Sequence, residues 1–209
     1  YEHGLAVVDA KLRLEQRENR VRTVMSEEAL AALSRIFKPS SVAVIGASSE
    51  SGKVGHSALK NIIDGGYKGE IYPINPRYDE ILGLRCYKNI KEVGRPVDLV
   101  MVVIPAAAVP PLMKELGDAH VAGAIVISSG FAETGNAQLQ IELAQRAREA
   151  GVRIIGPNTY GIYIPPMDLC AVFTAPFDVK GSLALSSQSG GVGMGMLGYS
   201  RSNKLGISA

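Results

Sequence analysis

The sequence predicts an α/β fold in which a Rossmann-like, doubly wound parallel sheet is followed by the start of a second α/β unit. Strand-length runs of Val, Ile and Leu alternate with helical patterns between residues 42 and 155. Such uninterrupted apolar strands are typical of parallel sheets covered by helices on both faces. Each run also passes into a loop of small and polar residues, and in these sheets the carboxyl ends of the strands form the ligand crevice.

This alternation assigns the elements in chain order. Strands are predicted at 42–46, 71–74, 98–104, 123–128 and 152–155. Helices are predicted at 55–64, 110–116 and 137–150, the second with prolines in its first turn and the third stopped by Gly151. With right-handed crossovers, these elements build one domain over residues 39–178.

Two flanks do not belong to this sheet. Residues 5–14 alternate like an edge strand, and a charged linker leads to a helix at 26–37 with Ser26 as its N-cap. Another strand-to-helix joint begins near Ser182, and a further strand begins near Ile207. We therefore expect a fragment, with one whole domain at 39–178, a linker and helix at 16–38, and parts of two neighbouring domains at 1–15 and 179–209.

The loop between the first strand and its helix, from Gly46 to Gly55, is the strongest functional signal. Glycines let a ligand approach the backbone, and the free N–H groups of a first helical turn attract phosphate. A Walker A loop is excluded, because one residue too many separates Gly46 from Gly52 and Val54 stands where a hydroxyl would bind Mg²⁺. We therefore expect a different phosphate ligand.

The end of the second strand narrows the choice of that ligand. An NAD fingerprint would need a carboxylate there to hold the ribose, and the sequence has Asn75, Pro76 and Arg77 instead. A guanidinium at this place suits the ribose phosphate of NADP or of coenzyme A. By itself, Arg77 is also compatible with a solvated loop residue.

The remaining strand ends share this small and polar character. They begin at Ile104, Ser128 and Gly156, and Glu133 is the only acid or base candidate among them. The loops carry no Ser/His/Asp or Cys/His set, so they are typical of a surface that holds a long phosphorylated ligand through its backbone. Turn chemistry alone would explain any single loop of this kind, but five on one edge favour binding.

Composition excludes several classes of protein. The 22 basic and 20 acidic residues nearly balance, for a net charge of +2, and no aromatic-studded basic stripe indicates nucleic acid. The apolar runs are too short to span a membrane. Cys86 and Cys170 lie far apart without a CxxC or His cluster, which favours two reduced thiols. Because no signal peptide is visible, the cytoplasm is the default location.

Six phrases in order resemble the nucleoside-diphosphate-forming acyl-CoA synthetases, which are related to succinyl-CoA synthetase. These phrases begin at Phe37, Ile71, Val97, Ser128, Ile155 and Ser187. The resemblance runs from about Ser34 to Ala209 and implies a CoA-binding domain followed by the start of a second, flavodoxin-like domain. Residues 1–15 are similar to the end of the family's ATP-grasp domain, and by that match Asp9 would be a Mg²⁺ ligand.

The resemblance implies an acid–thiol ligase that makes acyl-CoA from a carboxylic acid, CoA and ATP through a phosphohistidine and an acyl phosphate. It would place the CoA phosphates at Gly46, Ala47, Ser48, Ser49, Lys53, Val54 and Gly55, and the adenosine end near Asn75 and Arg77. It would place the pantetheine along Ile104, Pro105, Ala106, Ala107, Ser129, Gly130 and Phe131, and the thiol near Asn158. Ser187, Ser189 and Gly190 would hold the phosphate carried by the histidine.

No catalytic residue is expected within the chain itself. His3, His56 and His120 occupy positions that are ordinary for surface or helix-end histidines, so the family's phosphohistidine is expected beyond Ala209. We expect the chain to bind CoA without turnover, in an oligomer with the rest of its parent chain or a β-type subunit.

Two other functions remain open on the sequence alone. An NADP-dependent oxidoreductase and a non-enzymatic CoA-sensing module would use the same type of sheet. The sequence identifies neither the carboxylic acid nor the choice between ADP and GDP.

Overall fold

A five-stranded parallel sheet forms the centre of the computed structural model, which describes residues 26–174 and 180–208. The strands are β1 (Ser41–Ile45), β2 (Glu70–Ile74), β5 (Leu99–Val102), β6 (Gly123–Val126) and β7 (Arg153–Ile155). They lie in the order β2-β1-β5-β6-β7, and every neighbouring pair is parallel. The predicted doubly wound sheet is confirmed. Its direction of winding reverses between β1 and β5, as in the flavodoxin-like variant of this architecture.

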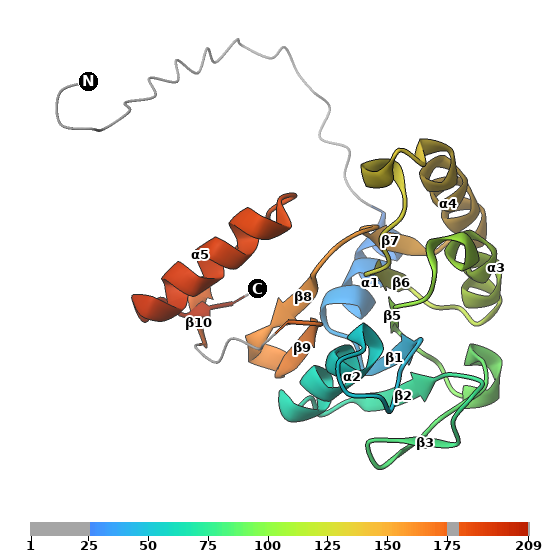
Figure 1. Cartoon of the computed structure of the whole chain (residues 1–209), viewed down its shortest axis with the longest axis horizontal. Coiled ribbons are helices and arrows are strands. Elements are labelled where there is room, and N and C mark those ends of the chain that lie inside the picture. The colour runs from blue at the N-terminus through green and yellow to red at the C-terminus, as the bar shows by residue number, and fades with distance from the viewer. Residues whose placement is uncertain (1–25, 175–179, 209) are drawn as a thin grey trace, which may run out of the picture.

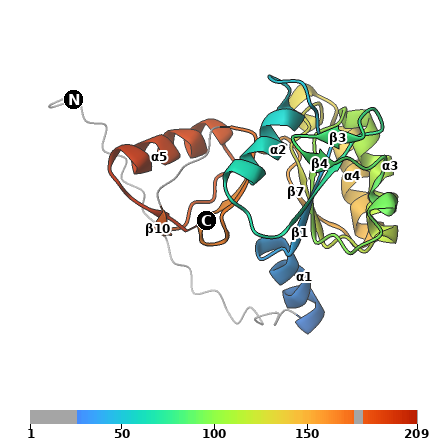
Figure 2. The same ribbon diagram turned by 90° about the horizontal axis from the view of Figure 1, so that it is seen from below.

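Helices cover both faces of the sheet, as the sequence predicts. One face carries α2 (Val54–Asp64) and α1 (Glu27–Phe37), and the other carries α3 (Val109–Asp118) and α4 (Ala137–Ala150), as Figures 1 and 2 show. Successive residues of each strand belong to opposite cores, so Ala43 packs toward α3 and α4 while Val42 packs toward α2.

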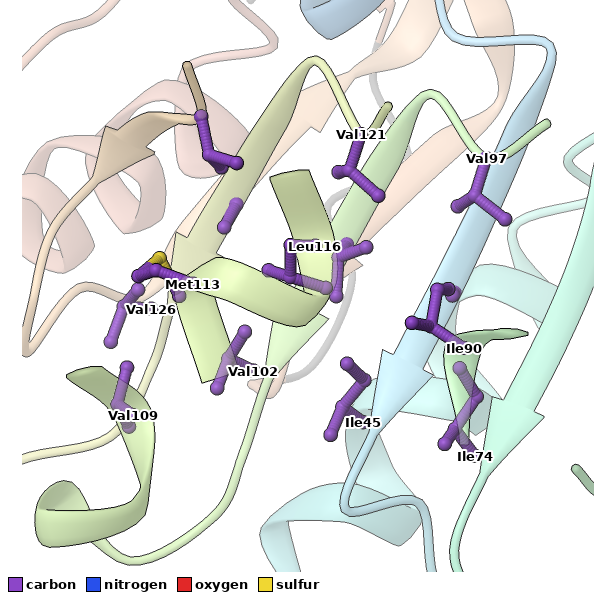
Figure 3. Close-up of a cluster of buried hydrophobic side chains, with 14 of the residues drawn as sticks. Ile45, Ile74, Ile90, Val97, Val102, Val109, Met113, Leu116, Val121 and Val126 are labelled. Carbon is purple, nitrogen blue, oxygen red and sulfur yellow. The ribbon is translucent and has the colours of Figure 1, made fainter. Parts of the chain in front are cut away.

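The core between the sheet and α3 shows why the strand runs are continuously apolar. Val109, Met113 and Leu116 of α3 point toward Val102 and Val126 on the strands (Figure 3). All five side chains are fully buried. Because an equivalent layer lies behind the sheet, no strand position here is available for a polar residue facing water.

Two short hairpins were not predicted from the sequence. β3 (Glu80–Ile81) and β4 (Leu84–Arg85) form one, in the connection between β2 and β5. β8 (Gly161–Ile164) and β9 (Leu169–Val172) form the other, which packs on α2. Asn61 of α2 donates hydrogen bonds from Nδ2 to the carbonyl oxygens of Val172 at 2.8 Å and Thr174 at 2.6 Å, and so fixes the end of this hairpin.

A second strand-helix-strand unit begins after the hairpin. It consists of β10 (Lys180–Leu183), α5 (Gly190–Ser202) and a parallel bridge from β10 to Ile207. The strand and the helix predicted from Ser182 onward are therefore confirmed, and they lie beside β8 and β9 (Figure 1). The predicted boundary at 178–179, the expected ATP-grasp segment at 1–15 and the linker up to residue 25 lie outside the described residues.

A buried carboxylate ties α1 to the amino-terminal edge of the sheet. Asp98 Oδ1 accepts a hydrogen bond from Arg35 Nε at 2.6 Å, and its Oδ2 accepts from the backbone N and Oγ of Ser40 at 2.8 and 2.6 Å. Burial by itself would raise the pKa of Asp98, but the hydrogen bonds from Ser40 and the paired guanidinium outweigh it and lower that pKa below its usual value. The network lies at the edge of the sheet opposite the loops that follow the strands.

Candidate functional site

The loops that follow the five parallel strands touch one another in the order of the strands. The loops after β2 and β1 are joined by Asn75, whose Nδ2 donates to the carbonyl oxygen of Ala47 at 2.8 Å. The loops after β1 and β5 meet at Gly46, where a Cβ atom would lie only 3.1 Å from Cγ2 of Ile104 and 2.3 Å from the carbonyl oxygen of Val103. Glycine is required here by both the close approach and its φ of +90°.

These loops form a row along the carboxyl edge of the sheet, and the row continues across the half of the sheet made by β5, β6 and β7. The loop after β6 approaches the loop after β5 at Gly130, where a Cβ atom would lie 3.2 Å from Cβ of Ala106. The loop after β7 is joined to the loop after β6 by the N–H of Asn158, which donates to the carbonyl oxygen of Ser128 at 3.0 Å. The sequence prediction that these five segments form one continuous edge is therefore confirmed.

The loop after β1 has the geometry of an anion site. The carbonyl oxygens of Ala47 and Ser48 are held from behind, the first by Asn75 and the second by Nδ1 of His56 at 3.1 Å. A peptide N–H points away from the carbonyl oxygen of the same unit, so the N–H groups of Ser48 and Ser49 face the opposite side. No hydrogen bond within the described residues uses these two N–H groups, which leaves them for a ligand.

The start of α2 lies directly behind this loop. Its N-cap residue Lys53 makes no side-chain capping bond. The N–H of His56 donates to the carbonyl oxygen of Lys53 at 3.0 Å, whereas no hydrogen bond within the described residues uses the N–H groups of Val54 and Gly55, which can meet an anion. Gly55 is pressed so closely against the loop that a Cβ atom would lie 2.0 Å from the carbonyl oxygen of Gly46. The ammonium group of Lys53 lies 3.9 Å from Oε2 of Glu50, and both side chains are exposed.

Arg77 stands at the other side of this loop, after β2. Its backbone N–H donates to Oδ1 of Asn75 at 3.0 Å, while its side chain is exposed and makes no ion pair within the described residues. Lys88 nearby in the fold differs, because its ammonium group pairs with Asp79 at 2.6 Å. Arg77 is therefore a cation available to a ligand at the β2 end of the row.

The loops after β5 and β6 form the middle of the row. Ile104 and Pro105 lead into a short helical turn at Ala106–Ala108, before α3. Ser129 is exposed, as a binding residue should be, but Phe131 is 0% exposed and belongs to the core. The Phe131 side chain therefore faces the core, and the expected place of this residue along a ligand stays a prediction for its backbone alone.

Glu133 explains the shape of this segment. Its Oε1 accepts hydrogen bonds from the N–H groups of Gly130 at 2.6 Å and Phe131 at 3.2 Å. The bond from Gly130 is the main cause that lowers the pKa of Glu133. A carboxylate stabilised in its ionised form by its own loop is a structural acceptor, so its expected place as the one acid or base candidate is not supported.

The row ends at an aromatic contact that the sequence did not reveal. Tyr160, two residues after the exposed Asn158, stacks on Phe173 with ring centroids 5.1 Å apart and an angle of 7° between the planes. Its ring also lies against Gly190, the first residue of α5, where a Cβ atom would be 2.1 Å from Cε2 of Tyr160. An aromatic residue among small loop residues was the signal that could have found it.

This contact brings the start of α5 to the β7 end of the row. Ser189 is the N-cap of α5, and its Oγ accepts a hydrogen bond from the N–H of Val192 at 3.3 Å. Ser187 donates from Oγ to the carbonyl oxygen of Ser189 at 2.9 Å and is exposed. The three residues predicted to hold a phosphate thus form one helix start beside Tyr160.

Neither of the described histidines belongs to the start of α5. His56 supports the loop after β1, and His120 follows α3 at the opposite edge, where its carbonyl oxygen accepts from Arg35 at 3.1 Å. Residues 26–174 and 180–208 contain no cluster of three or more His, Cys, Asp or Glu side chains that could hold a metal ion. The predicted Mg²⁺ ligand Asp9, and His3, lie outside the described residues.

None of the helices in the described part of the chain is long and apolar enough to span a membrane.

Comparisons with known proteins agree on one family. The model of the CoA binding domain family matches residues 40–165. The ADP-forming acetate–CoA ligase of Methanocaldococcus jannaschii is 44% identical over 160 residues, which cover 77% of this chain and 22% of that protein. The alpha subunit of ADP-forming acetate–CoA ligase I of Pyrococcus furiosus is 42% identical over 185 residues, covering 85% of this chain and 40% of the subunit.

A solved structure gives the same result. The dinucleotide-forming acetyl-coenzyme A synthetase 1 of Ca. Korarchaeum cryptofilum, in complex with phosphate and ADP, superposes with a TM-score of 0.81 at 41% identity. The match covers 84% of this chain and 38% of that one. The chain therefore spans between about a fifth and two fifths of the length of these relatives.

Proposed function

We propose that this chain, which belongs to the CoA-binding domain family, is the CoA-binding part of an acyl-CoA ligase of the ADP-forming type. One observation of the structure carries the proposal. The loops lie in the order β2, β1, β5, β6, β7 and then α5, and the features they offer follow the order of the groups along CoA. A free guanidinium comes first, an anion loop second, small uncharged loops next, and an exposed amide last.

Each end of CoA then has a matching partner. The guanidinium of Arg77 is placed for the phosphate on the adenosine ribose, and the free N–H groups of Ser48 and Ser49 are placed for the diphosphate. The pantetheine arm follows the loops at Ala106 and Ser129, whose small side chains leave its amides accessible to the protein backbone. CoA supplies the thiol that accepts the acyl group, and the Asn158 side chain orients that end.

The complete reaction involves parts of the enzyme that these residues do not form. We expect the start of α5, with Ser187, Ser189 and Gly190, to bind the phosphoryl group that arrives on a histidine, because free N–H groups and the helix dipole favour an anion there. ATP, Mg²⁺ and the acid would be handled by an ATP-grasp part on the same chain or on a β-type subunit. The domain division, an oligomer and the cytoplasmic location stay predictions.

Calorimetric titration of the 209-residue chain tests the CoA site. We expect micromolar binding of CoA, and Arg77→Ala should weaken CoA about tenfold while leaving dephospho-CoA nearly unchanged, because only CoA carries the ribose phosphate. Arg146→Ala, which removes an exposed arginine from α4, is the matched control. Tight NADPH binding without CoA binding would instead favour the oxidoreductase, and acyl-CoA formation by this chain alone would contradict the absence of a catalytic residue.

A further inference from the structure

The loop that offers free N–H groups to an anion also contains a carboxylate. Glu50 lies between Ser48 and Lys53, inside the segment that the proposed function assigns to the CoA diphosphate. Its backbone is part of the loop, because its N–H donates to Oγ of Ser48 at 3.0 Å and its carbonyl oxygen accepts from the N–H of Lys53 at 3.3 Å. The side chain is therefore carried by the same short turn that would hold the ligand.

Two neighbouring groups contact the Glu50 carboxylate. Tyr78, from the loop after β2, donates its phenolic hydrogen to Oε1 of Glu50 at 3.3 Å. The ammonium group of Lys53 lies 3.9 Å from Oε2 of the same carboxylate. The two oxygens thus face two different donors, both of which belong to loops at the phosphate end of the row.

These contacts have an electrostatic cost for any anionic ligand. An anion bound at the start of α2 would meet the like charge of Glu50 on the same loop, and neighbouring like charges repel. It would also compete with Glu50 for Lys53, the one cation contributed by this loop. Removal of the carboxylate therefore frees Lys53 and lowers the repulsion at the same time.

We propose that Glu50 is an internal counter-anion of the phosphate loop, which occupies Lys53 in the free protein and holds the affinity for CoA below what the loop would otherwise reach. This inference rests on the proposed function, because it assumes that the diphosphate binds at this loop. Tyr78 acts as a positioning residue, because its hydroxyl fixes the carboxylate next to Lys53. The lowered affinity lets the site release its ligand, which a site that must release an acyl-CoA product requires.

The test is the affinity of Glu50→Gln for CoA, measured by calorimetric titration at low ionic strength. Gln keeps the size of the side chain and can still accept from Tyr78, so only the charge is lost. We expect the Kd for CoA to fall about three- to tenfold, and the gain to shrink when salt is raised, because the interaction involves exposed charges. Pantetheine, which has no phosphate, should show no gain.

Two further variants separate this effect from others. Glu142→Gln removes the same charge from α4, where Glu142 pairs with Arg146 on the helix surface, and should leave the Kd unchanged. Tyr78→Phe should tighten CoA binding less than Glu50→Gln and add little in its presence, since both act through one carboxylate. Thermal unfolding of each variant confirms that it is folded.

The possible results are distinct. Unchanged or weaker CoA binding by Glu50→Gln would overturn the inference, and weaker binding would mean that the carboxylate contacts the ligand directly. Equal tightening by Glu142→Gln would also overturn it, because only net charge would then matter. If the unaltered chain failed to bind CoA at all, the proposed function itself would be wrong.

Discussion

Substitution of Gly55 by Ala tests whether the loop after β1 owes its ligand-binding shape to the start of α2. A Cβ atom at this position would lie 2.0 Å from the oxygen and 2.9 Å from the carbon of the Gly46 carbonyl group, and 3.3 Å from Cα of Ala47. All three atoms belong to the backbone, so no side chain can rotate to make room. The added methyl group must displace the loop or the first turn of the helix.

The expected cost in stability is modest, and the expected cost in binding is larger. An added methylene in a tight site costs about 1–3 kcal/mol, and Ala in place of Gly returns about 0.5–1 kcal/mol in a helix. The net loss of about 0–2.5 kcal/mol lowers the Tm by up to about 10 °C. Because the N–H groups of Ser48 and Ser49 move with the loop, CoA affinity should fall about tenfold or more.

Gly66→Ala is a matched control at the other end of the same helix. Gly66 has a φ of +81°, and no atom lies within 4 Å of the place that a Cβ atom would occupy, so Ala there is strained only by its backbone angle, at about 1–2 kcal/mol. Calorimetric titration with CoA and thermal unfolding would be run on both variants. If Gly55→Ala bound CoA as tightly as Gly66→Ala at comparable stability, the proposed coupling between the helix start and the loop would be refuted.

Two further predictions concern stability. Asp98→Asn should destabilise the fold by about 2–3 kcal/mol, since it leaves the buried donors and the Arg35 guanidinium without their charged partner. The control Asp118→Asn, on the surface, should cost less than about 0.5 kcal/mol. Equal losses of unfolding free energy in chemical denaturation would contradict the role of the buried network. Burial raises the pKa of the Cys170 thiol from 9.0 to about 11, so the folded state keeps a proton that the unfolded chain loses. The contribution of Cys170 is complete below pH 9 and disappears between pH 9 and 11, and Cys170→Ala should therefore lose less stability than the unaltered chain across this range.

The sheet and its helices were predictable because their signals are local. Five apolar runs and three periodic segments indicated the elements to within a few residues, and Ser26 caps α1 as expected, accepting from the N–H of Ala29 at 3.2 Å. The two hairpins gave no such signal. The strands β3 and β4 have only two residues each, too few to show alternation, and β8 and β9 are recognised only by their packing on α2.

The candidate site was predictable as an edge but not in its details. The strand-end loops are marked by residue type, so their positions and the family resemblance could be inferred from the sequence, and the family model and relatives confirm that resemblance. Whether a side chain faces the ligand or the core depends on contacts distant in the chain. Phe131 looked like a loop residue and is buried, while the importance of Tyr160 depends on Gly190, thirty residues later.

The linear order of the loops has a consequence for how such a site can diverge. Under the proposed function each loop would face one segment of CoA, and contacts such as those of Asn75 with Ala47 and of Asn158 with Ser128 join each loop to the next. Under the proposed function, mutations near β7 would alter the acceptance of different acyl groups while the nucleotide end stays intact. Proteins that share this row of loops could therefore acquire new substrates by local change near β7, because the nucleotide half of CoA would be recognised by other loops of the same sheet.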